Sequence, residues 1–150
     1  MSLWNQDQNP LPPEYAYLRL LSSDPMLLVT PGTYYRVAGI YQLWNKAGFT
    51  IDVDGVITYT GKGGDFMVVG MSDIEVNKDC TINYGTRVNG QIAGVTNHVF
   101  YALGRMGPIN STVIFSLHTG DEVEFWAASD TANTTFQSLT AKVSFYGHET

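Results

Sequence analysis

Hydrophobic and polar residues alternate along most of the chain from Pro31 onward, and no stretch keeps a helical period for a useful length. Because successive side chains of a β-strand point to opposite faces, this alternation predicts half-buried strands. It is clearest at 49–53, 56–60, 82–88, 113–117, 123–127 and 139–146. Together with 34–41 and 66–71, these stretches predict about eight to ten strands joined by turns. The expected fold class is therefore all-β, an antiparallel β-sandwich or jelly roll.

Short turn signals separate the predicted strands. Asp54-Gly55 ends the first clear run, and Asn89-Gly90 ends the run at 81–88. Asn-Gly favours the positive φ angles of a two-residue hairpin turn. We therefore expect a partner strand to start at Gln91 and to pair with the run before the turn.

Two segments are apolar at consecutive positions and so break the alternation. They are Phe66–Met71 and Val99–Leu103. A strand that is apolar on both faces must be covered on both, whereas the outer face of a two-layer sandwich meets water. Either a long loop or the N-terminal segment covers that face, or a second subunit does. The nine tyrosines and three tryptophans favour a subunit interface, where these residue types are enriched.

The first 30 residues differ from the rest of the chain. Asn9-Pro10-Leu11-Pro12-Pro13 favours a stiff, extended backbone, and the apolar stretch at 14–21 has no lasting period. We predict an extended N-terminal arm at 1–30 and a jelly-roll domain at 31–150. Such an arm is suited to lie along the surface of a partner. The candidate attachment residues are Trp4, Pro10, Pro12, Pro13 and Tyr15.

Composition narrows the possible functions. The 150 residues suit one domain, and only 15% are charged, with a formal net charge of −6. No basic stripe is present that could neutralise a row of phosphates, so nucleic-acid binding is not expected. Cys80 is the single cysteine, which excludes an intrachain disulfide, and we expect it to be a small buried residue of a strand. Neither a signal peptide nor a membrane-spanning run is evident, which predicts synthesis in a cytoplasm without ordinary secretion.

The sequence shows no familiar catalytic or cofactor-binding motif. The histidines His98, His118 and His148 are far apart and form no His-x-His pair, so a metal enzyme of the cupin type is not expected. The glycine-rich segment at 61–64 lies between two predicted strands and lacks the helix that a phosphate-binding loop requires. It is interpreted as a flexible hairpin loop. We therefore predict no catalytic, cofactor-binding or metal-binding residues.

Two groups of carboxylates leave alternatives open. Asp52 and Asp54, with nearby Asp65, could supply oxygen ligands to Ca²⁺, but the favoured interpretation is that Asp52 and Asp54 face solvent on a strand and that Asp54 starts a turn. Glu122 and Glu124 share one strand face about 6 to 7 Å apart, near the separation that glycosidases use. Both follow a tight turn and alternate with core residues, which is the usual layout of an exposed strand edge.

The order and spacing of several segments resemble the jelly-roll domain of complement and tumour-necrosis-factor heads, particularly the version found in bacteriophage structural proteins. The segments are Gly55-Val-Ile-Thr-Tyr-Thr-Gly61, Phe66-x-Val68, the strand that ends at Asn89-Gly90, and Leu117-x-x-Gly120-Asp121-x-Val123-Glu124. The resemblance extends over residues 33–146 and leaves the arm outside.

This resemblance implies a compact homotrimer with no enzymatic activity, on the surface of a virion. Its subunit would be a capsid decoration or head-fibre protein, or the head of a tail fibre or spike that binds a receptor. The implied partners are two further copies of the chain, other virion structural proteins, and a glycan or protein on the host surface. The residues expected at the trimer interface are Phe66, Val68, Met71, Phe100 and Tyr101. 

Two alternatives have weaker support. A β-sandwich of this kind could also be a carbohydrate-binding module or a glycan-active enzyme, for which Trp126 beside Glu124 is the local indication. A soluble signalling ligand of the complement or tumour-necrosis-factor type is disfavoured by the lack of a recognisable signal peptide or stalk.

Overall fold

The computed structural model describes residues 14–20, 25–37, 41–46, 48–101 and 105–149. This part of the chain contains twelve strands and no helix, so it has no helix long and apolar enough to cross a membrane. The strands form two six-stranded antiparallel sheets. The all-β sandwich predicted from the alternation is confirmed. Twelve strands exceed the expected eight to ten. Part of the difference is that β2 and β3 have only three and two residues, which is too short for an alternating pattern to be recognised in the sequence.

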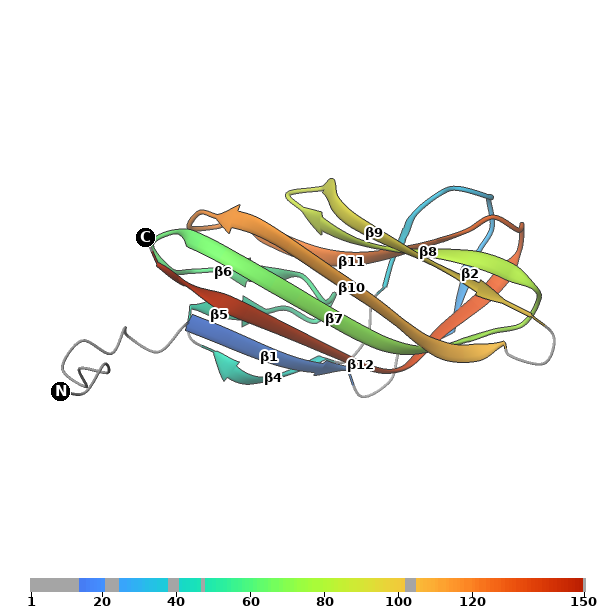
Figure 1. The fold of residues 1–150 in the computed structure, drawn as a ribbon, viewed down its shortest axis with the longest axis horizontal. Helices are drawn as coiled ribbons and strands as arrows, with labels where there is room; N and C mark the ends of the chain where they lie inside the picture. The colour runs from blue at the N-terminus through green and yellow to red at the C-terminus, as the bar shows by residue number, and fades with distance from the viewer. Residues whose placement is uncertain (1–13, 21–24, 38–40, 47, 102–104, 150) are drawn as a thin grey trace, which may run out of the picture.

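Sheet A contains the first and last strands of the chain. Its order is β10-β7-β12-β1-β4, and β2 pairs with β12. The strands are β1 (Glu14–Leu20), β2 (Met26–Leu28), β4 (Tyr41–Lys46), β7 (Gly64–Val76), β10 (Met106–Leu117) and β12 (Thr134–Glu149). Figure 1 shows β12, at the red end of the colour scale, between the green β7 and the blue β1.

Sheet B has a hairpin at the predicted Asn-Gly turn along one of its edges. Its order is β5-β6-β11-β8-β9, and β3 pairs with β11. The strands are β3 (Tyr35–Arg36), β5 (Phe49–Ile51), β6 (Ile57–Tyr59), β8 (Cys80–Val88), β9 (Gln91–Phe100) and β11 (Glu122–Ser129). Asn89 and Gly90 have φ angles of 51° and 79°, as a two-residue turn between twisted strands requires. The expected hairpin between β8 and β9 is confirmed.

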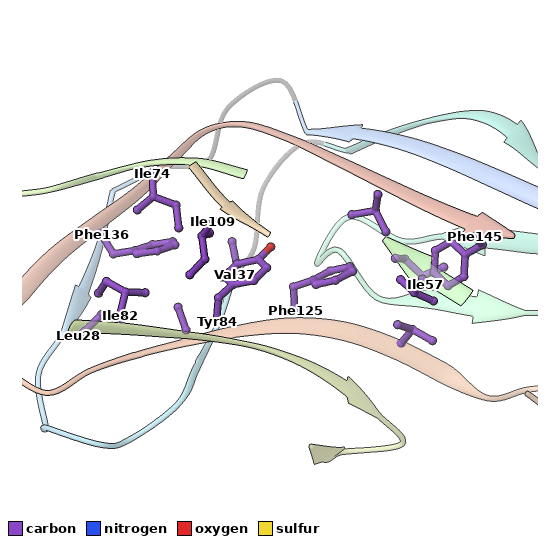
Figure 2. Close-up of a cluster of buried hydrophobic side chains, with 14 of the residues drawn as sticks. Leu28, Val37, Ile57, Ile74, Ile82, Tyr84, Ile109, Phe125, Phe136 and Phe145 are labelled. Atoms are coloured by element: carbon purple, nitrogen blue, oxygen red, sulfur yellow. The ribbon is translucent and has the colours of Figure 1, made fainter. Parts of the chain in front are cut away.

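The hydrophobic core lies between the two sheets. Alternate residues of β7 and β12 in sheet A face alternate residues of β8 and β11 in sheet B, and Figure 2 shows these side chains meeting. Cys80 is part of this core, as expected, and burial raises the pKa of its thiol. At one end, the rings of Phe49, Phe66 and Phe145 are close, with Phe49 4.5 Å from Phe145 and 5.5 Å from Phe66 between ring centroids.

In the middle of the core, small residues of sheet A face large rings of sheet B. Tyr84 and Phe125 stack with ring centroids 5.9 Å apart. A Cβ atom at Gly70 would lie 3.5 Å from the Phe125 ring, which is ordinary van der Waals contact, so Gly70 lies directly under that ring. Beside it, Ser72 and Ser138 form a buried hydrogen bond of 2.6 Å between their hydroxyl oxygens, which satisfies both polar groups inside the sandwich.

Three expectations about strand limits are corrected. The arm was expected to reach residue 30, but β1 pairs with β12 and β4, and β2 pairs with β12, so both strands belong to sheet A. Val53 was expected to point inward, but it lies in the turn after β5 and is 91% exposed. The strand of Glu124 was expected at an edge, but β11 lies between β6 and β8, and Glu124 is buried.

Candidate functional site

One side of the sandwich, formed by β9 and β10, is almost free of charge. β9 is an edge strand of sheet B, and β10 is an edge strand of sheet A. Arg105, which precedes β10, is the only charged residue between Arg87 and Asp121. Edge strands of this length are usually protected from association by charged residues, because their unpaired backbone groups can bind another chain. The β9/β10 side therefore has the composition of a surface that another molecule covers.

The two edge strands come together through a glycine. A Cβ atom at Gly94 of β9 would lie 2.0 Å from Cγ1 of Val113, so the valine occupies the space that a side chain would need. Farther along the strands, Gly107 of β10 lies beside His98 and Phe100, and a Cβ there would be 3.7 Å from each ring. Gly94 allows close contact between the two sheets on this side, whereas Gly107 has room for a Cβ, and β9 and β10 form one continuous surface.

A row of large apolar side chains crosses the outer face of sheet A. Ile114 of β10 is opposite Met67 of β7, and Met67 is opposite Tyr146 of β12. Their exposed fractions are 76%, 39% and 48%. Directly paired residues point to the same face of a sheet, so these three side chains form a continuous strip, here called the apolar row. Met71, two pleats along β7, is 49% exposed on the same face.

A second apolar strip lies on β9. Ile92, Val95 and Val99 are 46%, 43% and 47% exposed and face away from the core, which receives Phe100 of the same strand. Tyr101, just after β9, is 67% exposed. This strip, called the β9 strip, belongs to the outer face of sheet B. The described part of the chain thus carries two separate apolar surfaces near the β9/β10 side.

The residues predicted for a trimer interface divide between core and surface. Phe66, Val68 and Phe100 have at most 1% exposure and fill the interior of the sandwich, so their side chains are not on an outer face. Met71 and Tyr101 are exposed, but they lie on different sheets. The neighbours of the predicted residues, rather than those residues themselves, therefore provide most of the exposed apolar surface.

The predicted attachment residues are mostly outside the described part of the chain. Trp4, Pro10, Pro12 and Pro13 lie outside the described residues. Tyr15 belongs to β1, where its backbone pairs with Tyr146, the last member of the apolar row. The register therefore places Tyr15 in line with the apolar row, next to Tyr146.

The outer face of sheet B also carries a compact group of rings and charges, here called the arginine cluster. The guanidinium carbon of Arg87 lies 4.0 Å from the centre of the Trp126 ring and 5.6 Å from that of Tyr34. Trp126 donates a hydrogen bond of 3.2 Å from Nε1 to Glu124, whose carboxylate is 3.6 Å from Arg36. Glu124 is thus held by one hydrogen bond and one ion pair. The sequence indicated Trp126 beside Glu124, but it did not show that Arg87 and Tyr34 join them.

The turn between β10 and β11 is bonded to the β8–β9 hairpin. Asn89 donates from Nδ2 to Asp121 at 2.9 Å, and the amide of His118 donates to the same carboxylate at 2.8 Å. These two hydrogen bonds lower the pKa of Asp121 below its usual value. The amide of Glu122 donates to Oδ1 of Asn89. These hydrogen bonds tie the two turns together, so the side chains of Asn89 and Asp121 have a structural role.

Two of the three possible calcium ligands, Asp52 and Asp65, already accept hydrogen bonds within the fold. Oδ1 of Asp52 accepts hydrogen bonds of 2.9 Å from the amides of Asp54 and Val56, which closes the turn after β5. Asp65 accepts a hydrogen bond from Ser116 on the outer face of sheet A. Within the described residues, no three His, Cys, Asp or Glu side chains lie together as a metal site would need.

Comparison with solved structures identifies the fold. The structure of murine APRIL aligns with a TM-score of 0.62 over 89% of this chain and 99% of that chain, at 14% identity. Eiger TNF from S. frugiperda aligns with a TM-score of 0.59 over 93% and 96%, at 12% identity. The vertex protein P5 of phage PRD1 aligns with a TM-score of 0.55 over 89% and 96%, at 12% identity. No family model and no curated protein sequence matches the chain.

The chain has the TNF-like jelly-roll fold. At these levels of identity the likeness establishes the fold and leaves the function open. It confirms the fold part of the resemblance noted in the sequence, and it includes a phage structural protein among the similar folds.

Proposed function

We propose that the chain is a non-enzymatic structural subunit of a bacteriophage particle, and that three copies assemble on the virion surface. The observation that carries this proposal is the apolar row on the outer face of sheet A. An exposed strip of Ile114, Met67 and Tyr146 is unfavourable in a protein that remains a monomer in water.

Burial of the apolar row would stabilise an assembly substantially. Full burial of one large apolar side chain contributes about 1.5 to 3 kcal/mol relative to exposure. Ile114 has 76% of its surface still to bury, and Met67 and Tyr146 have 39% and 48%. The three side chains would contribute roughly 2 to 5 kcal/mol per subunit before the cost of association, because each is already partly covered. Burial of the apolar row would therefore favour assembly through the sheet A face, and the rest of the interface would have to offset the remaining cost of association.

The arrangement of apolar surfaces favours a closed ring. The apolar row and the β9 strip differ from each other, so a contact between them is heterologous and repeats around a rotation axis. A ring that closes removes both surfaces from water in every subunit. Closure with three subunits is what the resemblance to complement and tumour-necrosis-factor heads implies. The uncharged β9/β10 side would then lie against a neighbouring copy.

The assignment to a phage particle rests on two likenesses. The sequence segments resemble phage structural proteins, and the fold is similar to the PRD1 vertex protein P5. Its partners would be two further copies and other virion proteins, and a host surface glycan or protein if the subunit forms a fibre head. Purified particles would contain the chain in multiples of three, as measured by quantitative mass spectrometry against a major capsid protein. Its absence from particles would contradict the proposal.

A further inference from the structure

The turn between β8 and β9 contains a chemically sensitive pair, Asn89-Gly90, and both residues are exposed. The backbone nitrogen that follows an asparagine can attack its side-chain amide, and a following glycine hinders this attack least because it has no side chain. Apart from its chain neighbours, no described residue has an atom within 4 Å of the place where a Cβ of Gly90 would lie. Solvent and space therefore permit the reaction, and the conformation of the turn controls it.

The reaction is a deamidation, and water is its only co-reactant. The Gly90 nitrogen forms a bond to Cγ of Asn89, and the bond from Cγ to Nδ2 breaks. Nδ2 leaves as ammonia and takes the amide proton of Gly90 with it. Water then opens the five-membered ring at one of its two carbonyl groups. The product is an aspartate at position 89, either in the ordinary linkage or in the iso linkage, in which the main chain runs through the side-chain carboxyl.

The folded turn holds the reacting atoms apart. Asn89 and Gly90 have φ angles of 51° and 79°, the left-handed angles of a two-residue hairpin turn. A residue in this region has a ψ of about +47°, which places the next nitrogen almost opposite Cβ across the Cα–C bond. Ring closure needs that nitrogen on the same side as Cβ, so the Asn89 backbone must first leave the left-handed region. Deamidation therefore requires the turn to open.

Hydrogen bonds to the turn between β10 and β11 oppose this opening. Nδ2 of Asn89 donates to Asp121, and the amide of Glu122 donates to Oδ1 of Asn89, both at 2.9 Å. The amide of Asn89 donates to the carbonyl of Glu122, also at 2.9 Å. The Asp121 carboxylate is itself held by the amide of His118 at 2.8 Å. The leaving nitrogen and the oxygen of the side-chain amide are thus both fixed by the neighbouring turn.

We propose that Asn89 is a deamidation site that its hydrogen bond to Asp121 protects, and that deamidation there separates the two turns. An aspartate at position 89 has no amide donor for Asp121, so two carboxylates would face each other where the 2.9 Å hydrogen bond now lies. The iso linkage would also lengthen the main chain within a two-residue turn. Both products loosen the β8–β9 hairpin. The change is irreversible, so the deamidated fraction grows with the time that the turn spends open.

The first test follows Asn89 in the full-length chain by peptide mass spectrometry during incubation at mildly alkaline pH. Deamidation is expected to be at least about tenfold slower in the native chain than in the chain unfolded in guanidinium chloride, because the reaction needs an open turn. Asn133 is the internal reference: its φ is also left-handed, at 53°, but the β-branched Thr134 follows it and hinders the attack in both states. Equal rates at Asn89 in the native and unfolded chains would overturn the proposal.

Variants test the role of Asp121. Asp121→Ala removes the acceptor and is expected to speed deamidation at Asn89 about tenfold under native conditions, the effect on a local opening of losing one hydrogen bond to a charged group. Asp121→Asn keeps a weaker acceptor in place and should give an intermediate rate. Asp130→Ala is the matched control, because Asp130 accepts a hydrogen bond of 2.8 Å from the amide of Thr81 at the opposite end of β8 and β11. An unchanged rate in Asp121→Ala, or equal acceleration in Asp130→Ala, would overturn this role.

Asn89→Asp reproduces the ordinary product and tests its effect on the fold. Its midpoint of urea unfolding at neutral pH is expected below that of the native chain, because two carboxylates then face each other. Combination with Asp121→Asn exchanges donor and acceptor and should recover about half of the loss or more. An Asn89→Asp protein as stable as the native chain, or a double variant without recovery, would overturn the proposed separation of the turns. The proposal is independent of trimer formation, so a monomeric protein would leave these tests valid.

Discussion

Replacement of Gly94 by alanine tests how the two sheets meet at the β9/β10 side. The new Cβ would lie 2.0 Å from Cγ1 of Val113, whereas carbon atoms prefer about 3.5 to 4.0 Å. Val113 has one strongly restricted side-chain torsion and cannot swing away freely. Either the valine leaves its preferred rotamer or β9 moves away from β10. Overpacking of this kind costs about 1 to 3 kcal/mol of the free energy of unfolding.

The assay is urea denaturation at a fixed protein concentration, followed by circular dichroism. Val113→Ala alone is expected to cost about 1 to 2 kcal/mol, because it removes two half-buried methyl groups. In the Gly94→Ala/Val113→Ala double variant, the alanine at 113 leaves space for the new methyl group at 94. The double variant should therefore lose less free energy of unfolding than the sum of the two single losses, by about 1 kcal/mol or more. Gly107→Ala is the control, with its Cβ at an ordinary 3.7 Å from its neighbours. A Gly94→Ala protein as stable as the native chain would refute the reasoning.

Three further predictions concern single sites, each measured by the same unfolding assay. Gly147→Ala should destabilise the folded protein more than Gly94→Ala does, because its Cβ would be 2.3 Å from the backbone oxygen of Asp65 and 2.6 Å from the buried Phe66 ring. A neutral effect would contradict this close packing of β12 against β7. Thr86→Val should stabilise by about 1 kcal/mol, since the buried hydroxyl has no partner among the described residues; a large loss would reveal an undetected partner. The pKa of Asp121 is lowered in the folded protein, so its contribution to the free energy of unfolding is fully present above its unfolded pKa and is lost as pH falls through its folded pKa. The stability difference between the native chain and Asp121→Asn should therefore shrink between pH 7 and pH 3. A constant difference would contradict the assignment.

The fold was largely predictable from the sequence because the alternation directly reports which residues face the core. Val123 and Phe125 point inward as expected, and the Asn89-Gly90 turn joins the predicted hairpin. β1 was assigned to an arm because its apolar stretch lacks alternation and follows a proline-rich segment. Its place in sheet A depends on pairing with β12, at the other end of the chain, which a local pattern does not reveal.

The candidate surface was only partly predictable for a related reason. The doubly apolar segment at 66–71 correctly indicated an outer face that carries apolar residues, but Phe66 and Val68 turned out to be its inward members. Met67 and Met71 are the outward members. Which of the alternating residues face outward depends on how β7 is placed between β10 and β12. The apolar row also requires Ile114 to be aligned with Met67, and such a register between distant strands is fixed by the whole sheet.

The arginine cluster shows the same limit. Tyr34, Arg87 and Trp126 lie on three separate segments, and each alone is an ordinary strand or loop residue. Residues that act together across neighbouring strands become visible only once the strand order is known.

Sedimentation equilibrium of the full-length chain tests the central claim most directly. The account predicts a mass of three subunits of 16.5 kDa at micromolar concentration. Met67→Asp and Ile114→Asp should each convert the trimer to folded monomers, because a charge in the apolar row must lose its hydration on assembly. Val53→Asp, at a residue 91% exposed in the turn after β5, should remain trimeric. A native chain that sediments as a monomer, or Met67→Asp and Ile114→Asp variants that remain trimeric, would contradict the account.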